Sequence, residues 1–269
     1  MTVLTGALTG VRAVVTGATS GLGEAMADAL LAAGATVAAA ARPTPRLDAA
    51  VRRWAGRGLA AEAMPMDVRD PASVAAAARG LTGRWGRVDL VVNNAGLGTR
   101  SVNPRYRTEP MPFYQVSPDG FGDVVATNLT GYFLVARAFA PLLVEQGHGG
   151  FVNISVNHAT MRRRGFVPYG PSRAGSEALS AIMTEDLRPH GVDVNVLLPG
   201  GGTATGMIPD LATDPSRDRL LPAQIMGPPV VFLASAEAKG VTGERIVATE
   251  FAGWLESFRA RAAGKNARN

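Results

Sequence analysis

The sequence predicts an α/β domain with a doubly wound, mostly parallel sheet of about seven strands and helices on both faces. Short apolar runs alternate with longer segments whose apolar residues recur at helical spacing. Such strand–helix alternation produces parallel strands that are covered on both sides. No repeat, low-complexity segment or Pro/Gly-rich linker divides the 269 residues. We therefore expect a single domain over residues 1–259, followed by a disordered basic tail over 260–269.

The first half of the chain supplies four expected strands and three expected helices. Residues 12–16 form a short apolar run, and a helix over 22–33 ends at Gly34, a good C-cap. Asp70 and Pro71 are suited to an N-cap and a first helical position, so a helix begins there and continues to about residue 84. The other apolar runs and a weaker helical pattern predict strands at 35–41, 59–66 and 88–92 and a helix at 46–57.

The second half begins with a proline-containing loop over 97–115. Ser117 and Pro118 then provide the start of a long helix that continues to about residue 145. The same apolar patterns predict strands at 150–155, 192–198 and 245–249 and helices at 169–188 and 222–235.

The composition indicates a globular protein and excludes several kinds of site. Hydrophobic residues make up 46% and charged residues 18%, which is enough to bury a core. The absence of cysteine excludes disulfides, a thiol nucleophile and cysteine-ligated metal, and three scattered histidines predict no metal site. The apolar run at 29–41 is too short to span a bilayer, and residues 1–4 do not resemble a secretory signal. We expect a cytoplasmic protein with no membrane partner.

The basic residues predict no nucleic-acid partner. The formal charge is +5, and all 27 basic residues are arginine except Lys239 and Lys265. They are spread along the chain, apart from Arg162–Arg164 and the C-terminal tail. A nucleic-acid-binding surface requires a basic face or stripe, which this pattern does not supply.

A glycine-rich turn lies between the first expected strand and the first expected helix. It reads Thr16-Gly17-Ala18-Thr19-Ser20-Gly21-Leu22-Gly23. Glycines in this context let the backbone approach a pyrophosphate closely, and the following helix N-terminus offers free N–H groups to the anion. The turn therefore predicts a dinucleotide site.

Several later motifs accompany this turn. They are Asp67-Val68, Asn93-Asn94-Ala95-Gly96, Asn128 within Thr-Asn-Leu-Thr-Gly, Tyr169-Gly-Pro-Ser-Arg173, Pro199-Gly200 and Val241-Thr242-Gly243. Together with the spacing of the turn, these motifs resemble the short-chain dehydrogenase/reductase family over about residues 8–249. The resemblance implies a Rossmann-type sheet. It also implies cofactor contacts from Gly17, Thr19, Ser20, Gly21, Leu22, Gly23, Asp67, Val68, Asn94, Ala95, Gly96, Tyr169, Arg173, Pro199, Gly200 and Thr205.

The end of the second strand favours NADP(H) over NAD(H). In the family an acidic residue there bonds the ribose of NAD, whereas arginine accommodates the 2′-phosphate of NADP. Residues 38–41 are all alanine, and Arg42 follows them. Arg42 is also one arginine in an arginine-rich chain, but the missing carboxylate favours NADP(H) under either interpretation.

The resemblance implies that Tyr169 is the catalytic acid/base and that Asn128 anchors a proton relay. Tyrosine ordinarily has a pKa near 10, so it needs a neighbouring cation to work near neutral pH. The family's cation is lysine, and here Arg173 takes its position, four residues after Tyr169 on the same helical face. Arg173 keeps the charge but cannot release its proton. The exchange is therefore either neutral drift or a sign of impaired turnover.

The family's substrate-orienting serine is displaced in this sequence. Its usual place is 13 positions before the tyrosine, and that position is Val156. Ser155 is one residue earlier and is the predicted donor, while Asn157 and His158 are further polar candidates. The predicted catalytic set is therefore Tyr169, Ser155, Arg173 and Asn128, with Asn157 as the alternative donor.

Two inserted loops, near 97–116 and 201–221, are expected to build the substrate pocket, because ligands bind beyond the carboxyl ends of the strands. The aromatic residues of the first loop either contact substrate or pack together. Arg162–Arg164 either lie in a solvated turn or attract an anionic group. The resemblance also implies a homodimer or homotetramer.

The predicted function is an NADP(H)-dependent oxidoreductase that interconverts a carbonyl and an alcohol on a small organic substrate. Two alternatives remain open. The first is a nucleotide-binding protein with little redox activity, which the Arg173 and Val156 departures suggest. The second is a non-redox enzyme, such as a dehydratase or isomerase, that uses the same pocket.

Overall fold

The computed structural model describes residues 6–208 and 219–266, and one seven-stranded sheet lies at its centre. Its order is β3-β2-β1-β4-β5-β6-β7, and every neighbouring pair of strands in the described chain is parallel. The strands are β1 (Arg12–Thr16), β2 (Thr36–Ala41), β3 (Ala61–Pro65), β4 (Leu90–Asn93), β5 (Gly150–Ile154), β6 (Asp193–Leu198) and β7 (Arg245–Val247). The doubly wound α/β prediction is confirmed.

The central strands are continuous apolar runs because both faces of the sheet are covered. Val14 of β1 lies between Ala38 of β2 and Val91 of β4, and all three are buried. The chain winds in opposite directions on either side of β1 and β4, so the strand order reverses between them. In parallel α/β sheets, ligands bind at the carboxyl ends of the strands at such a reversal.

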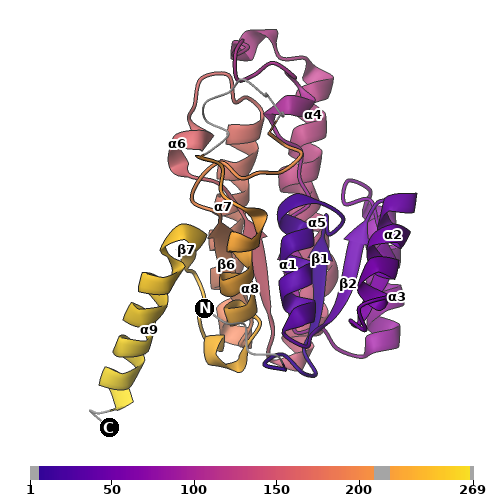
Figure 1. The fold of residues 1–269 in the computed structure, drawn as a ribbon, viewed down its shortest axis with the longest axis vertical. Helices are drawn as coiled ribbons and strands as arrows, with labels where there is room; N and C mark the ends of the chain where they lie inside the picture. The colour runs from indigo at the N-terminus through magenta and orange to yellow at the C-terminus, as the bar shows by residue number, and fades with distance from the viewer. Residues whose placement is uncertain (1–5, 209–218, 267–269) are drawn as a thin grey trace.

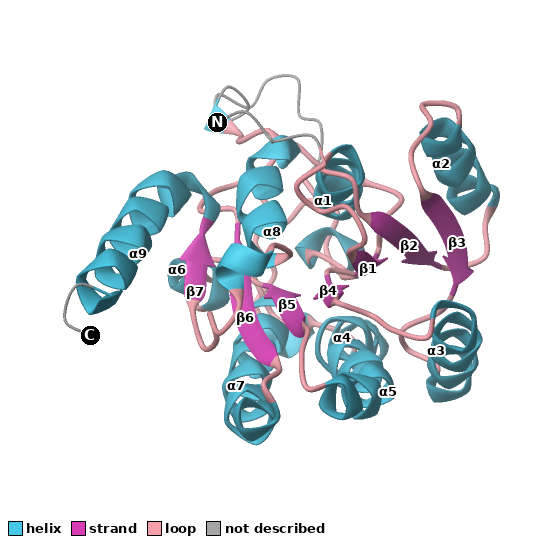
Figure 2. Cartoon of the chain, turned by 90° about the horizontal axis from the view of Figure 1, so that it is seen from below, coloured by secondary structure: helices cyan, strands magenta, loops and turns pink. Residues whose placement is uncertain are grey.

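Helices cover both faces of the sheet, and each face has its own hydrophobic core. The helices are α1 (Gly21–Ala32), α2 (Pro45–Ala55), α3 (Pro71–Trp85), α4 (Pro118–Val125), α5 (Gly131–Gln146), α6 (His158–Met161), α7 (Tyr169–Leu187), α8 (Gly227–Leu233) and α9 (Phe251–Asn266). Figure 2 shows α1 and α8 on one side of the sheet, and α3, α5 and α7 on the other.

The expected helix from residue 117 to 145 is interrupted at its centre. A π-helical segment, Ala126–Thr130, joins α4 to α5. The whole stretch Pro118–Gln146 is long and apolar enough to cross a membrane, with a mean hydropathy of 1.2, but 50% of its most apolar part is buried inside the structure. Core helices that pack against a sheet have this same character, and α5 contacts α3, α7, β4 and β5.

The C-terminal segment corrects an expectation from the sequence. The disordered tail expected from residue 260 is instead helical as far as Asn266, within α9. Aromatic packing anchors this helix: the Trp254 and Phe258 rings stack with centroids 5.5 Å apart, and Phe232 meets Trp254 edge-on at 5.6 Å. Arg259 also pairs with Glu237 at 2.6 Å. In Figure 1, α9 extends away from the sheet beyond β7.

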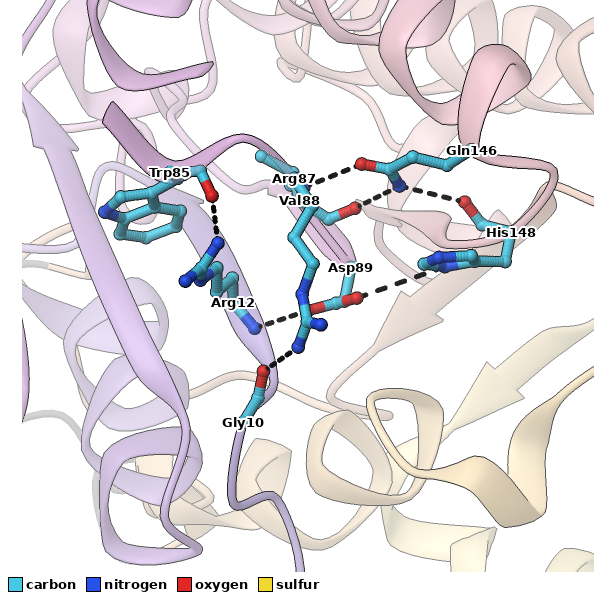
Figure 3. A network of polar contacts seen from close by, with 8 residues as sticks. All are labelled: Gly10, Arg12, Trp85, Arg87, Val88, Asp89, Gln146 and His148. Carbon is cyan, nitrogen blue, oxygen red and sulfur yellow. Dashed lines mark hydrogen bonds and ion pairs between the residues drawn. The ribbon is translucent and has the colours of Figure 1, made fainter. Parts of the chain in front are cut away.

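A polar network fixes the amino ends of β1 and β4, at the edge of the sheet opposite the strand ends where ligands bind (Figure 3). The Asp89 carboxylate accepts a hydrogen bond from the Arg12 backbone N–H at 2.7 Å and lies 4.0 Å from His148 Nδ1. Gln146, at the end of α5, bonds both backbone groups of Val88, at 3.0 and 2.8 Å. These contacts fix the start of β4 relative to β1 and to the end of α5.

Candidate active site

The glycine-rich turn forms a backbone cradle between β1 and α1. Gly17 and Gly21 have φ values of +65° and +56°, a conformation that favours glycine. A Cβ placed on Gly23 would lie 2.2 Å from the Gly17 carbonyl oxygen. The backbone of the turn therefore packs closely on itself and on Asn94, at the N-terminus of α1, and leaves no room for side chains at these glycines. Predicted contact residues Thr19, Ser20 and Leu22 belong to this turn, and the cradle fits a pyrophosphate.

The loop after β4 is tied to this cradle. The Thr16 hydroxyl oxygen accepts hydrogen bonds from the backbone N–H groups of Asn94 and Ala95, at 2.9 and 3.0 Å. The Asn94 amide in turn donates to the Thr16 carbonyl oxygen at 2.9 Å. The predicted motif that contains Asn94, Ala95 and Gly96 therefore lies beside the glycine turn.

Replacing Gly23 by alanine is expected to weaken dinucleotide binding. The new methyl group would meet the Gly17 carbonyl and the Asn94 amide, so the turn must shift at a cost of about 1–3 kcal/mol in stability. We expect the Kd for NADPH to increase at least about tenfold. Gly83→Ala is the matched control, because Gly83 lies in α3 with open space around it and alanine favours a helix. Unchanged NADPH affinity in Gly23→Ala would refute this account of the turn.

Arg42 is exposed directly after β2, at the carboxyl edge of the sheet. A hollow of about 410 Å³ is lined mainly by the residues that come after Arg42 in the chain. The residues that line this hollow are Pro43, Thr44, Pro45, Leu47, Asp48 and Pro65.

The neighbouring Asp67 side chain has a partner that the sequence did not reveal. The Arg69 guanidinium bonds both carboxylate oxygens of Asp67, at 3.1 and 2.8 Å. This hydrogen bonding is the main cause that lowers the pKa of Asp67, and the charge of Arg42 adds a smaller effect in the same direction. Val68, another predicted cofactor residue, is buried against α5, where a Cβ on Gly131 would lie 3.0 Å from it.

Asn128 is fully buried in the π-helical segment. Its side-chain oxygen accepts from the Leu97 backbone N–H at 2.7 Å, and its amide donates to the Leu97 carbonyl oxygen at 2.9 Å and the Ser172 hydroxyl at 3.0 Å. Asn128 thus connects the loop after β4 to the first turn of α7. Single π turns of this kind occur frequently at functional sites.

Arg173 is 2% exposed and lies four residues after Tyr169 in α7. Its Nη1 donates to the Tyr132 hydroxyl at 2.6 Å and to the Ile154 carbonyl oxygen at 2.9 Å. The guanidinium carbon lies 5.5 Å from the centre of the Tyr169 ring. The structure therefore brings the predicted cation and the predicted acid/base together.

The charge of Arg173 is maintained by its surroundings. Burial by itself lowers the pKa of Arg173, but its electrostatic and hydrogen-bond interactions with Tyr132 and Tyr169 raise it more, so its pKa lies above the ordinary arginine value. Burial raises the pKa of Tyr132 despite the adjacent guanidinium. Arg173 therefore carries its positive charge throughout the pH range in which proteins work.

The two candidate orienting donors differ in their contacts. Ser155 is 3% exposed, and its hydroxyl has no hydrogen-bond partner within the described ranges. The Asn157 amide donates to the Gly200 carbonyl oxygen at 2.9 Å. Between them, the Val156 carbonyl oxygen accepts from Arg245 at 2.8 Å, and Glu177 binds Arg245 at 3.1 Å. The segment after β5 is thus fixed by β7 and α7, and the buried Ser155 hydroxyl makes no competing hydrogen bond among the described residues.

A row of aromatic rings leads from the first inserted loop to Tyr169. The Tyr106 and Phe166 rings meet edge-on with centroids 5.6 Å apart, and Phe166 lies 6.5 Å from Tyr169. The exposed Arg163 guanidinium covers Phe166 at 5.3 Å. Part of the predicted substrate loop therefore reaches the candidate acid/base beside a positive charge.

The second inserted loop reaches the glycine turn through Thr205. A Cβ on Gly21 would lie 3.2 Å from the Thr205 side chain. Pro199 and Gly200 follow β6, and the Pro199 carbonyl oxygen accepts from the Thr249 backbone N–H at 3.3 Å. Residues 209–218 of this predicted loop lie outside the described residues.

Sequence reasoning missed Tyr132. It is 2% exposed, yet its hydroxyl contacts Arg173 and donates to the Ile154 carbonyl oxygen at 3.2 Å. The available signal was its position four residues after Asn128 in an apolar helix, where a phenol needs a polar partner.

Comparisons with known proteins point to one family. The family model described as short chain dehydrogenase matches residues 12–216. Gluconate 5-dehydrogenase from Gluconobacter oxydans is 31% identical over 193 residues, 72% of each chain. The 3-oxoacyl-[acyl-carrier-protein] reductase FabG from Escherichia coli is 30% identical over 242 residues, 87% of this chain and 93% of FabG. The crystal structure of a gluconate 5-dehydrogenase from Burkholderia cenocepacia in complex with NADP and tartrate has a TM-score of 0.79 and 28% identity, covering 89% of this chain and 93% of that one.

Proposed function

This chain belongs to the short-chain dehydrogenase family, and we propose that it is an NADP(H)-dependent oxidoreductase with Tyr169 as its acid/base. It interconverts a carbonyl and an alcohol on a small organic substrate. The observation that carries the proposal is the burial of the Arg173 guanidinium 5.5 Å from the Tyr169 ring. This contact keeps a permanent charge beside the phenol even though arginine replaces lysine.

NADPH, when bound, supplies the hydride for carbonyl reduction. The chain holds the dinucleotide through the backbone cradle of Gly17, Gly21 and Gly23, with Thr205 beside it. The Ser155 hydroxyl donates to the carbonyl oxygen and orients it. The Tyr169 hydroxyl then protonates that oxygen as it gains charge, and Arg173 stabilises the phenolate that remains. Asn128 holds the loop and the first turn of α7 on which Tyr169 depends.

Comparing two alanine variants identifies the orienting donor. Ser155→Ala is expected to lower kcat/KM about a hundredfold, because it removes a hydrogen bond to the developing oxyanion. Asn157→Ala should have a smaller effect, since the Asn157 amide already bonds the Gly200 carbonyl. Steady-state kinetics of both variants distinguishes them. A larger loss in Asn157→Ala would transfer the role to that residue.

Arg42 is proposed to bind the 2′-phosphate of NADP(H). The chain has no carboxylate at the end of β2, and NADP is bound in the related Burkholderia structure. Arg42→Ala should increase the Kd for NADPH about tenfold and leave the Kd for NADH nearly unchanged, because only NADPH carries the phosphate. Fluorescence titration of the three tryptophans measures both values. Arg79→Ala, an exposed arginine on α3, controls for net charge. Equal losses for the two cofactors would exclude the phosphate role.

We also propose anionic carbonyl substrates, a cytoplasmic location and a homodimer or homotetramer. Arg163 over Phe166 supports the first, because it places a positive charge along the aromatic row that reaches Tyr169. Exposed Phe133 on α5 and Ile182 on α7 support self-association through these helices. Substrate affinity that is indifferent to ionic strength would count against the anionic class.

Incubation with NADPH and a panel of carbonyl compounds tests the proposed function. The panel includes keto acids and β-oxoacyl thioesters, and absorbance follows NADPH while chromatography follows the products. We expect NADPH loss matched by alcohol formation. NADPH binding without oxidation across the panel would favour a nucleotide-binding protein, and product without net NADPH loss would favour a dehydratase or isomerase.

A further inference from the structure

Tyr132 contacts the candidate active site from within the core. It lies near the start of α5, and its hydroxyl accepts a hydrogen bond from Arg173 Nη1 at 2.6 Å while donating to the Ile154 carbonyl oxygen at 3.2 Å. Ile154 is the last residue of β5 and directly precedes Ser155. The Tyr132 hydroxyl therefore joins three elements of the site: α5, α7 and the end of β5.

The Arg173 guanidinium lies close to two phenol rings. Its central carbon is 5.4 Å from the centre of the Tyr132 ring and 5.5 Å from that of Tyr169. Nη1 bonds Tyr132 and Ile154, whereas Nε has no hydrogen-bond partner in residues 6–208 or 219–266. Because the guanidinium is planar, two hydrogen bonds at Nη1 restrict the orientation of the whole head group.

The direction of Nη2 follows from this anchoring. A Cβ placed on Gly96 would lie 2.4 Å from Nη2, so this nitrogen faces the loop after β4 that borders the glycine turn. Without the Tyr132 hydroxyl, Nη1 would keep only the Ile154 carbonyl, and the guanidinium could rotate away from Gly96. A lysine ammonium lacks the planar, forked set of N–H donors that arginine has, and would not need this anchor.

We propose that Tyr132 is a positioning residue specific to arginine at position 173: its hydroxyl aims the guanidinium at the Tyr169 ring and the cofactor loop. This proposal rests on the proposed function. The hydroxyl acts through Arg173 and does not itself touch the reacting atoms. Tyr132 thus compensates for the exchange of lysine for arginine, because the larger planar head requires a second fixed partner.

A double-mutant cycle tests this dependence. Four proteins are compared: the wild type, Tyr132→Phe, Arg173→Lys and the double variant. Tyr132→Phe keeps the buried ring and removes only the hydroxyl. In the arginine background we expect it to lower kcat about tenfold and to weaken NADPH binding several-fold, with KM for the carbonyl nearly unchanged. In the lysine background the same change should alter both quantities by less than about twofold.

Equal losses in both backgrounds would overturn the proposal, because they would show that Tyr132 acts through packing. A general loss of folding would also lower both quantities equally in the two backgrounds, and thermal unfolding of the four proteins would reveal it. No loss in the arginine background would also overturn it. NADPH binding is read from tryptophan fluorescence without turnover, so the cycle remains decisive even if the panel of carbonyls yields no oxidation. The absence of oxidation across the panel would instead refute the proposed function.

Discussion

Tyr169→Phe lowers turnover about a thousandfold and leaves the Kd for NADPH within about twofold of the wild type. The substitution removes the one hydroxyl proposed to protonate the substrate oxygen. It retains the ring that packs near Phe166 and Arg173, so the surrounding structure has no reason to change. Steady-state kinetics and fluorescence titration give the two quantities separately.

The separation of the two effects is what makes this experiment informative. A parallel loss of NADPH affinity would mean that the substitution disturbs the cofactor site. Turnover within tenfold of the wild type would remove Tyr169 from the acid/base role and leave the fold and the dinucleotide site intact.

Arg173→Met separates activity from stability. The guanidinium is buried against two phenol groups and a carbonyl group, with no carboxylate paired to it among the described residues. A buried charge without a counter-charge is costly, so methionine should increase Tm, by about 2–4 °C for each kcal/mol gained. Turnover should fall about a hundredfold, because the phenolate left on Tyr169 loses its cation.

Differential scanning calorimetry and kinetics together check both parts of this prediction. A lower Tm would show that the hydrogen bonds to Tyr132 and Ile154 outweigh the cost of burying the charge. Undiminished turnover would show that Arg173 is a structural replacement for the family's lysine and does not assist Tyr169.

The fold was predictable because its signals are local. The apolar runs of β1, β2 and β4 and the glycine turn are each continuous in the sequence, and each indicates a single local structure. The pairing of Tyr169 with Arg173 was also predictable, since four residues separate them on one helix.

The contacts that sequence reasoning missed join elements far apart in the chain. Tyr132 meets Arg173 only because α5 and α7 pack side by side on one face of the sheet (Figure 2). The helical course of α9 depends on Phe232 packing against Trp254 across a separate helix, whereas the basic composition of residues 260–269 suggested disorder. Tertiary packing sets such partners, and no local pattern encodes them.

Hydride transfer with labelled cofactor tests the central claim most directly. The wild type and Tyr169→Phe are incubated with a carbonyl substrate and NADPH that carries deuterium as its transferable hydride. The account predicts deuterium on the new alcohol carbon in the wild-type product and almost none from Tyr169→Phe over the same interval. Unlabelled product, or equal labelling by the two proteins, would contradict it.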